Sequence, residues 1–241
     1  MSEKNSDQVS DQAVVENAAD APEERAPKKR RKAGIMAAVV AVVLVAAGVG
    51  MWVWHEDPSF CGTVCHTPMN AYYETYSQEF RTTGVDKYGN EVADTSCMLA
   101  TYHAAMNYDC MDCHIPVLSQ QVSEAVTWVS GNYEFPLAER SVAQLGEAAG
   151  LGSDEMCLNE SCHNLTRDDL YNLTAEEYGT YNPHWSHHET LDCGTCHKAH
   201  RASVMYCSQC HAQAVVPDGW LNMQQANELF DLENATLDAA A

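Results

Sequence analysis

Basic residues are scarce in this sequence. Its 241 residues include 34 acidic and only 13 basic side chains, which gives a formal net charge of −21. Residues 1–33 hold equal numbers of the two kinds, so the excess negative charge belongs to the rest of the chain. A nucleic-acid interface needs clustered Lys and Arg, and this acidic part of the chain is therefore not expected to bind nucleic acid. The charge would steer positively charged partner surfaces, although a self-repelling, soluble surface explains it equally well.

Strand patterns and an ordinary apolar core are also nearly absent after residue 55. Alternation of apolar and polar residues is rare there, whereas helical spacing is present at residues 69–80, 118–129, 137–149 and 220–232. Thr166 followed by Asp169 predicts the start of a further helix. The sequence therefore predicts a mainly α fold of short helices and long loops, whose interior is filled by something other than side chains.

One long apolar run covers residues 34–54, and about 20 helical residues span a bilayer core. Residues 1–33 contain no aromatic residue and end in a basic run, which predicts a disordered cytoplasmic tail. We therefore expect a single-pass protein of the cell membrane, with residues 55–241 forming one extracytoplasmic domain. A cleaved signal peptide is the alternative, but the run is long and no small-residue cleavage site precedes a polar start.

Ten of the eleven cysteines form five pairs, and each pair is followed at once by a histidine. This arrangement is the attachment code for c-type haem, in which two thiols bond the porphyrin and the histidine binds its iron. Zinc ribbons and disulfide frameworks do not require a histidine at that position. We expect five covalently bound haem c groups at Cys61/Cys65/His66, Cys110/Cys113/His114, Cys157/Cys162/His163, Cys193/Cys196/His197 and Cys207/Cys210/His211.

Two of the five sites have irregular spacers. Three residues separate Cys61 from Cys65 and four separate Cys157 from Cys162, so the loop must bulge for both thiols to reach one haem. Cys97 is left over and is expected to be a buried or idle thiol, with pairing between chains as the alternative. The sequence leaves open whether the protein forms a homo-oligomer.

Further histidines and one methionine are candidates for the sixth ligand of each iron. His200 follows His197 too closely to fold back onto the same haem, so we expect it to reach a neighbouring one. His103 is a second candidate, and the sequence does not choose among His184, His187 and His188. Met69 is either a ligand of the first iron or an ordinary apolar residue. His55 is expected at the membrane surface.

The order of these motifs resembles the NapC/NirT/NrfH group of membrane-anchored quinol dehydrogenases. The resemblance rests on residues 28–200, with the strings FCGTVCHTPM at residues 60–69, CMDCHIP at 110–116, CHN at 162–164 and CGTCHKAH at 193–200. It implies that electrons pass from menaquinol, near the first haem, to an extracytoplasmic reductase in anaerobic respiration. It also implies iron ligation by Met69, His103, His200 and either His184 or His187. The cytochrome partners of extracytoplasmic flavoprotein reductases are a related group that the chain also resembles.

The chain departs from this pattern in two ways. It has a fifth site, and it has no lysine between Lys87 and Lys198, where the resemblance places one at the quinol pocket. We nominate Glu124 and Glu134 as quinol proton acceptors held in a partly buried setting, with Asp57 as a weaker candidate. The alternative functions are a terminal reductase of a small oxyanion such as nitrite or hydroxylamine, and a passive electron conduit. Only six basic residues lie after the apolar run, which disfavours an oxyanion pocket.

Overall fold

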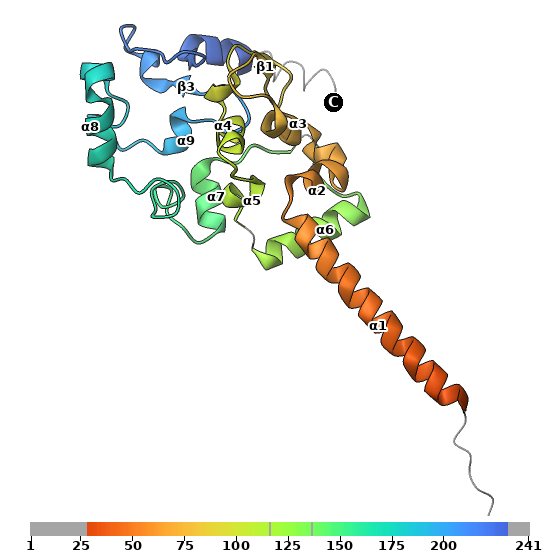
Figure 1. The fold of residues 1–241 in the computed structure, drawn as a ribbon. Coiled ribbons are helices and arrows are strands. Elements are labelled where there is room, and N and C mark those ends of the chain that lie inside the picture. Colours follow the sequence, from red (N-terminus) through yellow and green to blue (C-terminus); the bar gives the residue numbers. More distant parts are fainter. Residues whose placement is uncertain (1–27, 116, 136, 231–241) are drawn as a thin grey trace, which may run out of the picture. The chain divides into compact units, whose positions relative to one another are not determined.

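The computed structural model describes residues 28–115, 117–135 and 137–230 and divides into two compact units, Met1–Val49 and Gly50–Ala241 (Figure 1). Helix α1 (Lys28–His55) fills the described part of the first unit and continues into the second. Its residues 31–55 are long and apolar enough for a membrane anchor or a signal sequence. The helix begins at Lys28, before the predicted start at residue 34, because Lys and Arg are good helix formers. The remainder of the predicted tail lies outside the described residues.

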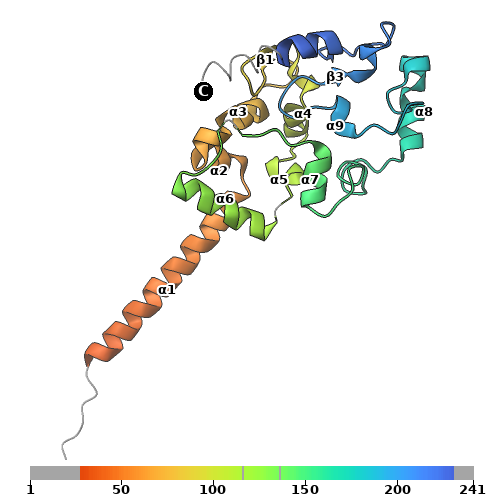
Figure 2. The same cartoon turned by 180° about the vertical axis from the view of Figure 1, so that it is seen from behind.

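The second unit confirms the predicted fold class of short helices joined by long loops (Figure 1 and, from behind, Figure 2). Its strands, within the described residues, are four of two residues each, and they form one antiparallel pair and one parallel pair. In chain order the elements are α2 (Pro58–Thr63), α3 (His66–Ser77), β1 (Gly84–Val85), β2 (Glu91–Val92), η1 (Thr95–Cys97), α4 (Leu99–Ala105), α5 (Cys110–Cys113), α6 (Leu118–Ser130), α7 (Val142–Ala148), α8 (Arg167–Tyr178), η2 (Gly179–Tyr181), α9 (Cys193–Cys196), β3 (Val204–Met205), η3 (Tyr206–Gln209) and β4 (Leu221–Asn222).

Capping side chains decide where several helices begin. Helix α8 starts as predicted, because the Thr166 hydroxyl accepts from the Asp169 amide and the Asp169 carboxylate accepts from the Thr166 amide. The same reciprocal pair between Ser141 and Gln144 starts α7 at Val142. The predicted start at residue 137 is therefore wrong by five residues, because a capped helix begins at its cap and not where helix-favouring composition begins.

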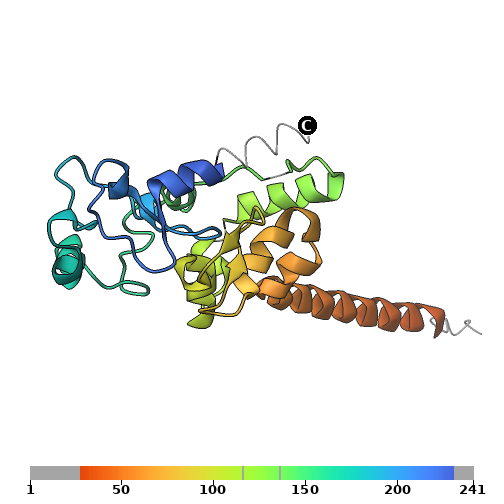
Figure 3. The ribbon, with the colours of Figure 1, turned by 90° about the horizontal axis from the view of Figure 1, so that it is seen from above.

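Two further boundaries differ from the predicted ones. Helix α3 begins at His66, three residues before the predicted start, because the chain turns into it directly from Cys65. The predicted helix at 220–232 begins only at residue 223, since Leu221 pairs with Val204 in β4. Asn222 then caps this helix by accepting from the Gln225 amide. Figure 3 shows the helix as the dark blue ribbon near the C-terminal end of the chain.

The apolar core of side chains is small, as expected. A cluster of buried residues within the described part of the chain comprises Val92, Cys97, Met98 and Ala202, with Trp220 and Leu221 packed against it. Cys97 is 3 % exposed, and burial raises the pKa of its thiol to about 11. The unpaired cysteine is thus a buried core residue that stays protonated at neutral pH.

Candidate haem-binding sites

The three sites with two-residue spacers are built on single helical turns. Helices α5 and α9 each begin at the first cysteine of a pair and end at the second, and η3 covers most of the third such pair. Residues three apart on a turn lie on one face, so both thiols point to the same side. In each site the histidine amide then donates to the carbonyl of the first cysteine: His114 to Cys110, His197 to Cys193 and His211 to Cys207.

The fifth site departs from the other regular sites at its second cysteine, Cys210. The second cysteine of α5 or α9 is the last residue of its helix, whereas η3 ends at Gln209 and Cys210 is only its C-cap. Exposure does not distinguish it, because Cys113 of the second site is exposed as Cys210 is, whereas Cys196 of the fourth site is buried. The turn still closes, because the Cys210 amide donates to the Cys207 carbonyl at 3.3 Å. Side chains three residues apart are aligned in a 3₁₀ turn, so the side chains of Cys207 and Cys210 lie on the same side of the turn. Attachment of haem at Cys210 stays a prediction.

The third site has the same histidine-to-cysteine hydrogen bond despite its longer spacer. The His163 amide donates to the Cys157 carbonyl at 3.1 Å, the same donor and acceptor positions as in the regular sites. Asn159 holds the bulge, because its side-chain oxygen accepts from the amides of Ser161 and Cys162. The two extra residues of the spacer therefore form a turn, and the hydrogen bond between the motif histidine and the first cysteine is kept.

The first site lies between two helices. Cys61 is on α2, Cys65 is the N-cap of α3, and His66 is the first residue of α3. Met69 follows His66 by one helical turn, so the two side chains share one face of the helix. Among the described residues, no other histidine ring lies against that of His66.

Neighbouring sites along the sequence are also neighbours in space. In each case a thiol of one site raises the pKa of a thiol of the neighbouring site. For Cys157 the hydrogen bond with Cys193 is the largest cause, and for Cys110, Cys113 and Cys196 burial has the larger effect. The pairs are Cys61 with Cys110, Cys113 with Cys162, Cys157 with Cys193 through a hydrogen bond, and Cys196 with Cys207. The five sites thus form one continuous series from first to fifth.

Four of the five motif histidines face a second imidazole. A histidine nitrogen lies about 2 Å from a metal that it binds, so rings on opposite sides of one iron have centres about 6 Å apart. The observed centre-to-centre distances are 6.5 Å for His114 and His200, 6.1 Å for His163 and His103, 6.4 Å for His197 and His184, and 6.3 Å for His211 with each of His187 and His188. This spacing fits a haem iron between each pair.

Three of the second imidazoles are oriented by hydrogen bonds. His103 donates from Nδ1 to the Leu99 carbonyl at 2.9 Å, because a carbonyl can only accept. Nδ1 of His200 lies 2.7 Å from the Thr75 hydroxyl, which itself donates to the Tyr72 carbonyl. His184 has the same relation to Thr174, whose hydroxyl donates to a carbonyl of α8. In all three, Nδ1 carries the proton and Nε2 keeps the lone pair that a metal needs.

Burial keeps these imidazoles neutral. It lowers the pKa of His200 to about 3 and that of His197 to about 4, in both cases with smaller contributions from neighbouring histidines. Burial likewise lowers the pKa of His103, His114 and His184. A neutral imidazole is the form that ligates iron, so the buried rings fit the cofactor that the cysteine motif implies.

The predicted proton acceptors lie in different surroundings. Glu124 on α6 is close enough to the first site to raise the pKa of Cys61 and Cys65, after the larger effect of burial. The expected partial burial is wrong for Glu124 and Glu134, because both residues are exposed. Asp57 is also exposed and caps α2 by accepting from the Ser59 amide at 2.8 Å. Capping of α2 therefore accounts for Asp57 without a role in quinol oxidation.

A cluster of basic residues was missed in the sequence because its members are far apart along the chain. Lys87 and Arg201 form ion pairs with Glu139 at 3.6 and 3.3 Å, and the charge of Lys198 also acts on this carboxyl. Burial alone would raise the pKa of Glu139, but Arg201 and Lys87 hold it below its ordinary value. The Lys87 amide donates to the His200 carbonyl, so the cluster adjoins the second site.

Five cysteine pairs, each followed by a histidine, and a second imidazole facing four of these histidines define a multihaem c-type cytochrome. The chain belongs to this family and carries covalently bound haem c. Residues 102–212, which contain the second to fifth sites, match the cytochrome c3 family model. The chain is 59 % identical over 201 residues to the cytochrome c-type protein Cgr1 of Eggerthella lenta, a match that covers 83 % of this chain and 92 % of that relative. No solved structure matches the chain.

Proposed function

We propose that this protein is a membrane-anchored electron carrier that takes electrons from menaquinol at its first site and delivers them from its fifth site to an extracytoplasmic reductase. The observation that carries the proposal is the continuous series of sites, in which a thiol of each site lies close enough to a thiol of the next, in sequence order, to shift the pKa of one of the two. When bound, haem supplies a reversible one-electron couple whose potential depends on its ligands and surroundings. The resemblance to quinol-oxidising cytochromes and the match to a c-type cytochrome support this role.

The proposed ligands follow from the imidazole pairs. The ten paired cysteines hold five haem groups, and the histidine after each pair is the proximal ligand at the second to fifth sites. We assign His200 as the distal ligand of the second site, His103 of the third and His184 of the fourth, because each ring has the required separation and a protonated Nδ1. Two fixed axial ligands leave no open position, as suits transfer of electrons without substrate binding.

At the first site, only one residue of α3 can be an iron ligand. Because His66 and Met69 lie one turn apart on α3, they cannot bind opposite sides of the same iron. We assign Met69 as the ligand from this face, where a thioether raises the potential relative to an imidazole. A higher potential at the entry favours acceptance of electrons from a donor.

The surroundings of the first site support entry from the membrane. Helix α6 exposes Leu118, Val122, Val126 and Val129, which are 57 to 77 % accessible and lie along one side of the helix. Glu124 on the same helix acts on Cys61 and Cys65. Since the first cysteine follows α1 by only six residues, an apolar stripe next to this site suits contact with lipid and with a lipid-soluble quinol. In this proposal α1 stays as the anchor, with its basic N-terminal end in the cytoplasm.

The arrangement of basic residues disfavours an oxyanion reductase. Such an enzyme needs basic side chains around an open iron. Lys87, Lys198 and Arg201 instead gather around Glu139 beside the second site, where His114 and His200 already face each other. The positive charges of this cluster also suit the carboxylates of a haem, which would reduce its net charge in an acidic domain.

Reduction of the full-length protein in liposomes by a menaquinol analogue tests the proposal. We expect quinol to reduce part of the haem absorbance that dithionite reduces in full, since the first site has the higher potential in this proposal. Reduction by dithionite without reduction by quinol would rule out the dehydrogenase role and leave a passive conduit. Glu124→Gln should slow the reaction with quinol more than Glu134→Gln, since only Glu124 adjoins the first site. Equal rates in both variants would place proton acceptance elsewhere.

A further inference from the structure

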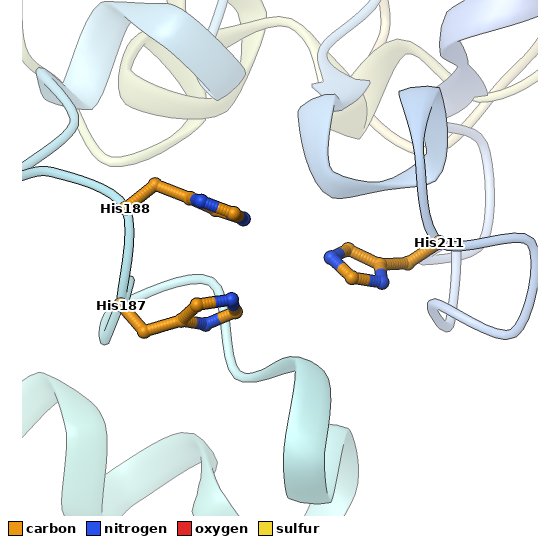
Figure 4. A group of neighbouring side chains, drawn as sticks. All are labelled: His187, His188 and His211. Atoms are coloured by element: carbon orange, nitrogen blue, oxygen red, sulfur yellow. The ribbon is translucent and has the colours of Figure 1, made fainter.

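The fifth site differs from the others in having two candidate distal histidines. His187 and His188 both point toward His211, and a ligand nitrogen of each of the three lies within 4.8 Å of the others (Figure 4). Each of the two rings has its centre 6.3 Å from that of His211. This value falls inside the 6.1 to 6.5 Å range of the other three pairs, so distance alone admits either residue.

The two rings are also the least constrained of the distal candidates. His103, His184 and His200 are each held by a hydrogen bond at Nδ1, whereas no hydrogen bond within the described residues holds the ring of His187 or His188. Both residues are exposed. The loop around them is held through its backbone, where the Ser186 hydroxyl accepts from the His188 amide at 3.2 Å. Neither ring is therefore fixed by a hydrogen bond of its own, and the ring of His187 contacts only the aromatic rings of Trp185 and His188 beside that of His211 among the described residues.

His211, by contrast, is held. Its ring packs on that of Tyr181 with centres 4.7 Å apart, and its amide donates to the Cys207 carbonyl. The proximal side of the fifth site is thus fixed, and the variable side is the one that His187 and His188 share. An iron bound by His211 has one opposite position, which takes one imidazole. The rings of His187 and His188, with centres 4.1 Å apart, are both close to that position.

We propose that His187 and His188 are interchangeable distal ligands of the fifth haem, an inference that rests on the proposed attachment of haem at Cys207/Cys210 with His211 as proximal ligand. When one imidazole leaves the iron, the other reaches the same position by side-chain rotation, without movement of the backbone. The site remains six-coordinate in both forms and opens no position for substrate.

The two forms differ in electronic structure. The ring of His188 makes an angle of 29° with that of His211, and the ring of His187 makes an angle of 61°. The relative orientation of two axial imidazole planes sets the splitting of the iron d orbitals, so the two forms have different spectra and different potentials. The site from which electrons leave therefore has two coordination states, and a partner that contacts the exposed loop can favour one of them.

Four variants of the full-length holoprotein test this: His187→Ala, His188→Ala, the double variant, and His184→Ala as a matched single change at the fourth site. We expect no haem to change from low spin to high spin in either single variant at the fifth site. By low-temperature electron paramagnetic resonance, His188→Ala should add a signal of the type given by strongly crossed imidazole planes, and His187→Ala one typical of nearly parallel planes. The double variant and His184→Ala should each convert one haem to high spin.

Several outcomes would overturn the inference. If one single variant at the fifth site is already high-spin, the residue removed is the sole distal ligand. If the double variant stays low-spin, the ligand comes from elsewhere. Intact mass tests the premise separately, because Cys207→Ser/Cys210→Ser should lose the mass of one haem. No loss relative to the parent would show that this pair carries no haem, whatever the outcome for the quinol reaction. Stoichiometric zinc in the purified protein would show that the three histidines hold an ion instead.

Discussion

His200 lies against His114 of the second site, with ring centres 6.5 Å apart, although it follows His197 of the fourth site by only three residues. The segment after the fourth cysteine pair therefore reaches back to an earlier site. Thr75 of α3 fixes the ring from behind through Nδ1. If His200 ligates the second iron, three distant parts of the chain are joined at one cofactor, and haem insertion is coupled to formation of the tertiary fold.

Replacing His200 with Ala should convert one haem from low spin to high spin, because the second site loses the only imidazole that faces His114 among the described residues. The visible and near-infrared spectra of the oxidised protein measure this change. His55→Ala is the control, since the His55 ring lies against Trp52 and Phe60 and not against a motif histidine. An unchanged spectrum for His200→Ala would remove this residue from the proposed ligand set.

The sequence predicted the local features of the sites well. The cysteine pairs, the motif histidines and the capping box of Thr166 are short-range patterns, and each appears in the structure as a single turn or loop. The pairing of His103 with His163 and of His184 with His197 depends on contacts between distant segments. Spacing identified these residues as candidates but could not decide between His184 and its neighbours or assign partners.

The residues that orient the ligands gave no sequence signal at all. Thr75 and Thr174 look like ordinary polar residues of amphipathic helices, and only the fold shows that each hydroxyl accepts from a histidine. The same holds for Glu139 and the basic residues around it, which come together from three loops. The burial expected for Glu124 was wrong because helical spacing does not show whether the acidic side of an exposed helix is covered.

Thr174→Val should raise the reduction potential of one haem without changing its spin state. The variant keeps the shape of the side chain but removes the acceptor for Nδ1 of His184, which makes the imidazole a weaker donor to iron. A neutral hydrogen bond is worth about 1 kcal/mol, and roughly 40 mV is the corresponding shift of a one-electron couple. A redox titration measures it. Thr127→Val is the control, because Thr127 bonds to the Ser123 carbonyl in the same way but touches no histidine.

Glu139→Gln should destabilise the domain by about 1 kcal/mol at pH 7, because it removes the partly exposed carboxylate that pairs with Lys87 and Arg201. The pKa of Glu139 is lowered in the folded protein, so its contribution is present above the unfolded pKa of about 4.3 and is lost as the pH falls through the lower folded value. Thermal unfolding between pH 7 and pH 3 measures the effect. The stability of the variant should depend less on pH in the acidic part of this range than that of the parent, and exposed Glu147→Gln should match the parent.

The intact mass of the holoprotein should correspond to five haem groups. The third site is the critical one, because its four-residue spacer is the most irregular, yet His163 closes on Cys157 as in the regular sites. The double variant Cys157→Ser/Cys162→Ser should lose the mass of one haem. Four haem groups in the parent, with no further loss in the double variant, would show that this pair is not an attachment site.

Two glutamates on the apolar stripe of α6 should slow reduction by quinol. In Val122→Glu/Val126→Glu the charges fall on side chains that are 57 and 63 % exposed beside the first site, where the proposal places the lipid surface. We expect the rate with a menaquinol analogue in liposomes to fall about tenfold, which corresponds to about 1.4 kcal/mol, while dithionite still reduces all haem groups. Ser123→Glu/Ser130→Glu adds the same charge to exposed positions of the same helix beside the stripe and should keep the rate close to that of the parent. An equal loss in both variants would attribute the effect to net charge, and no loss in either would place quinol entry away from α6.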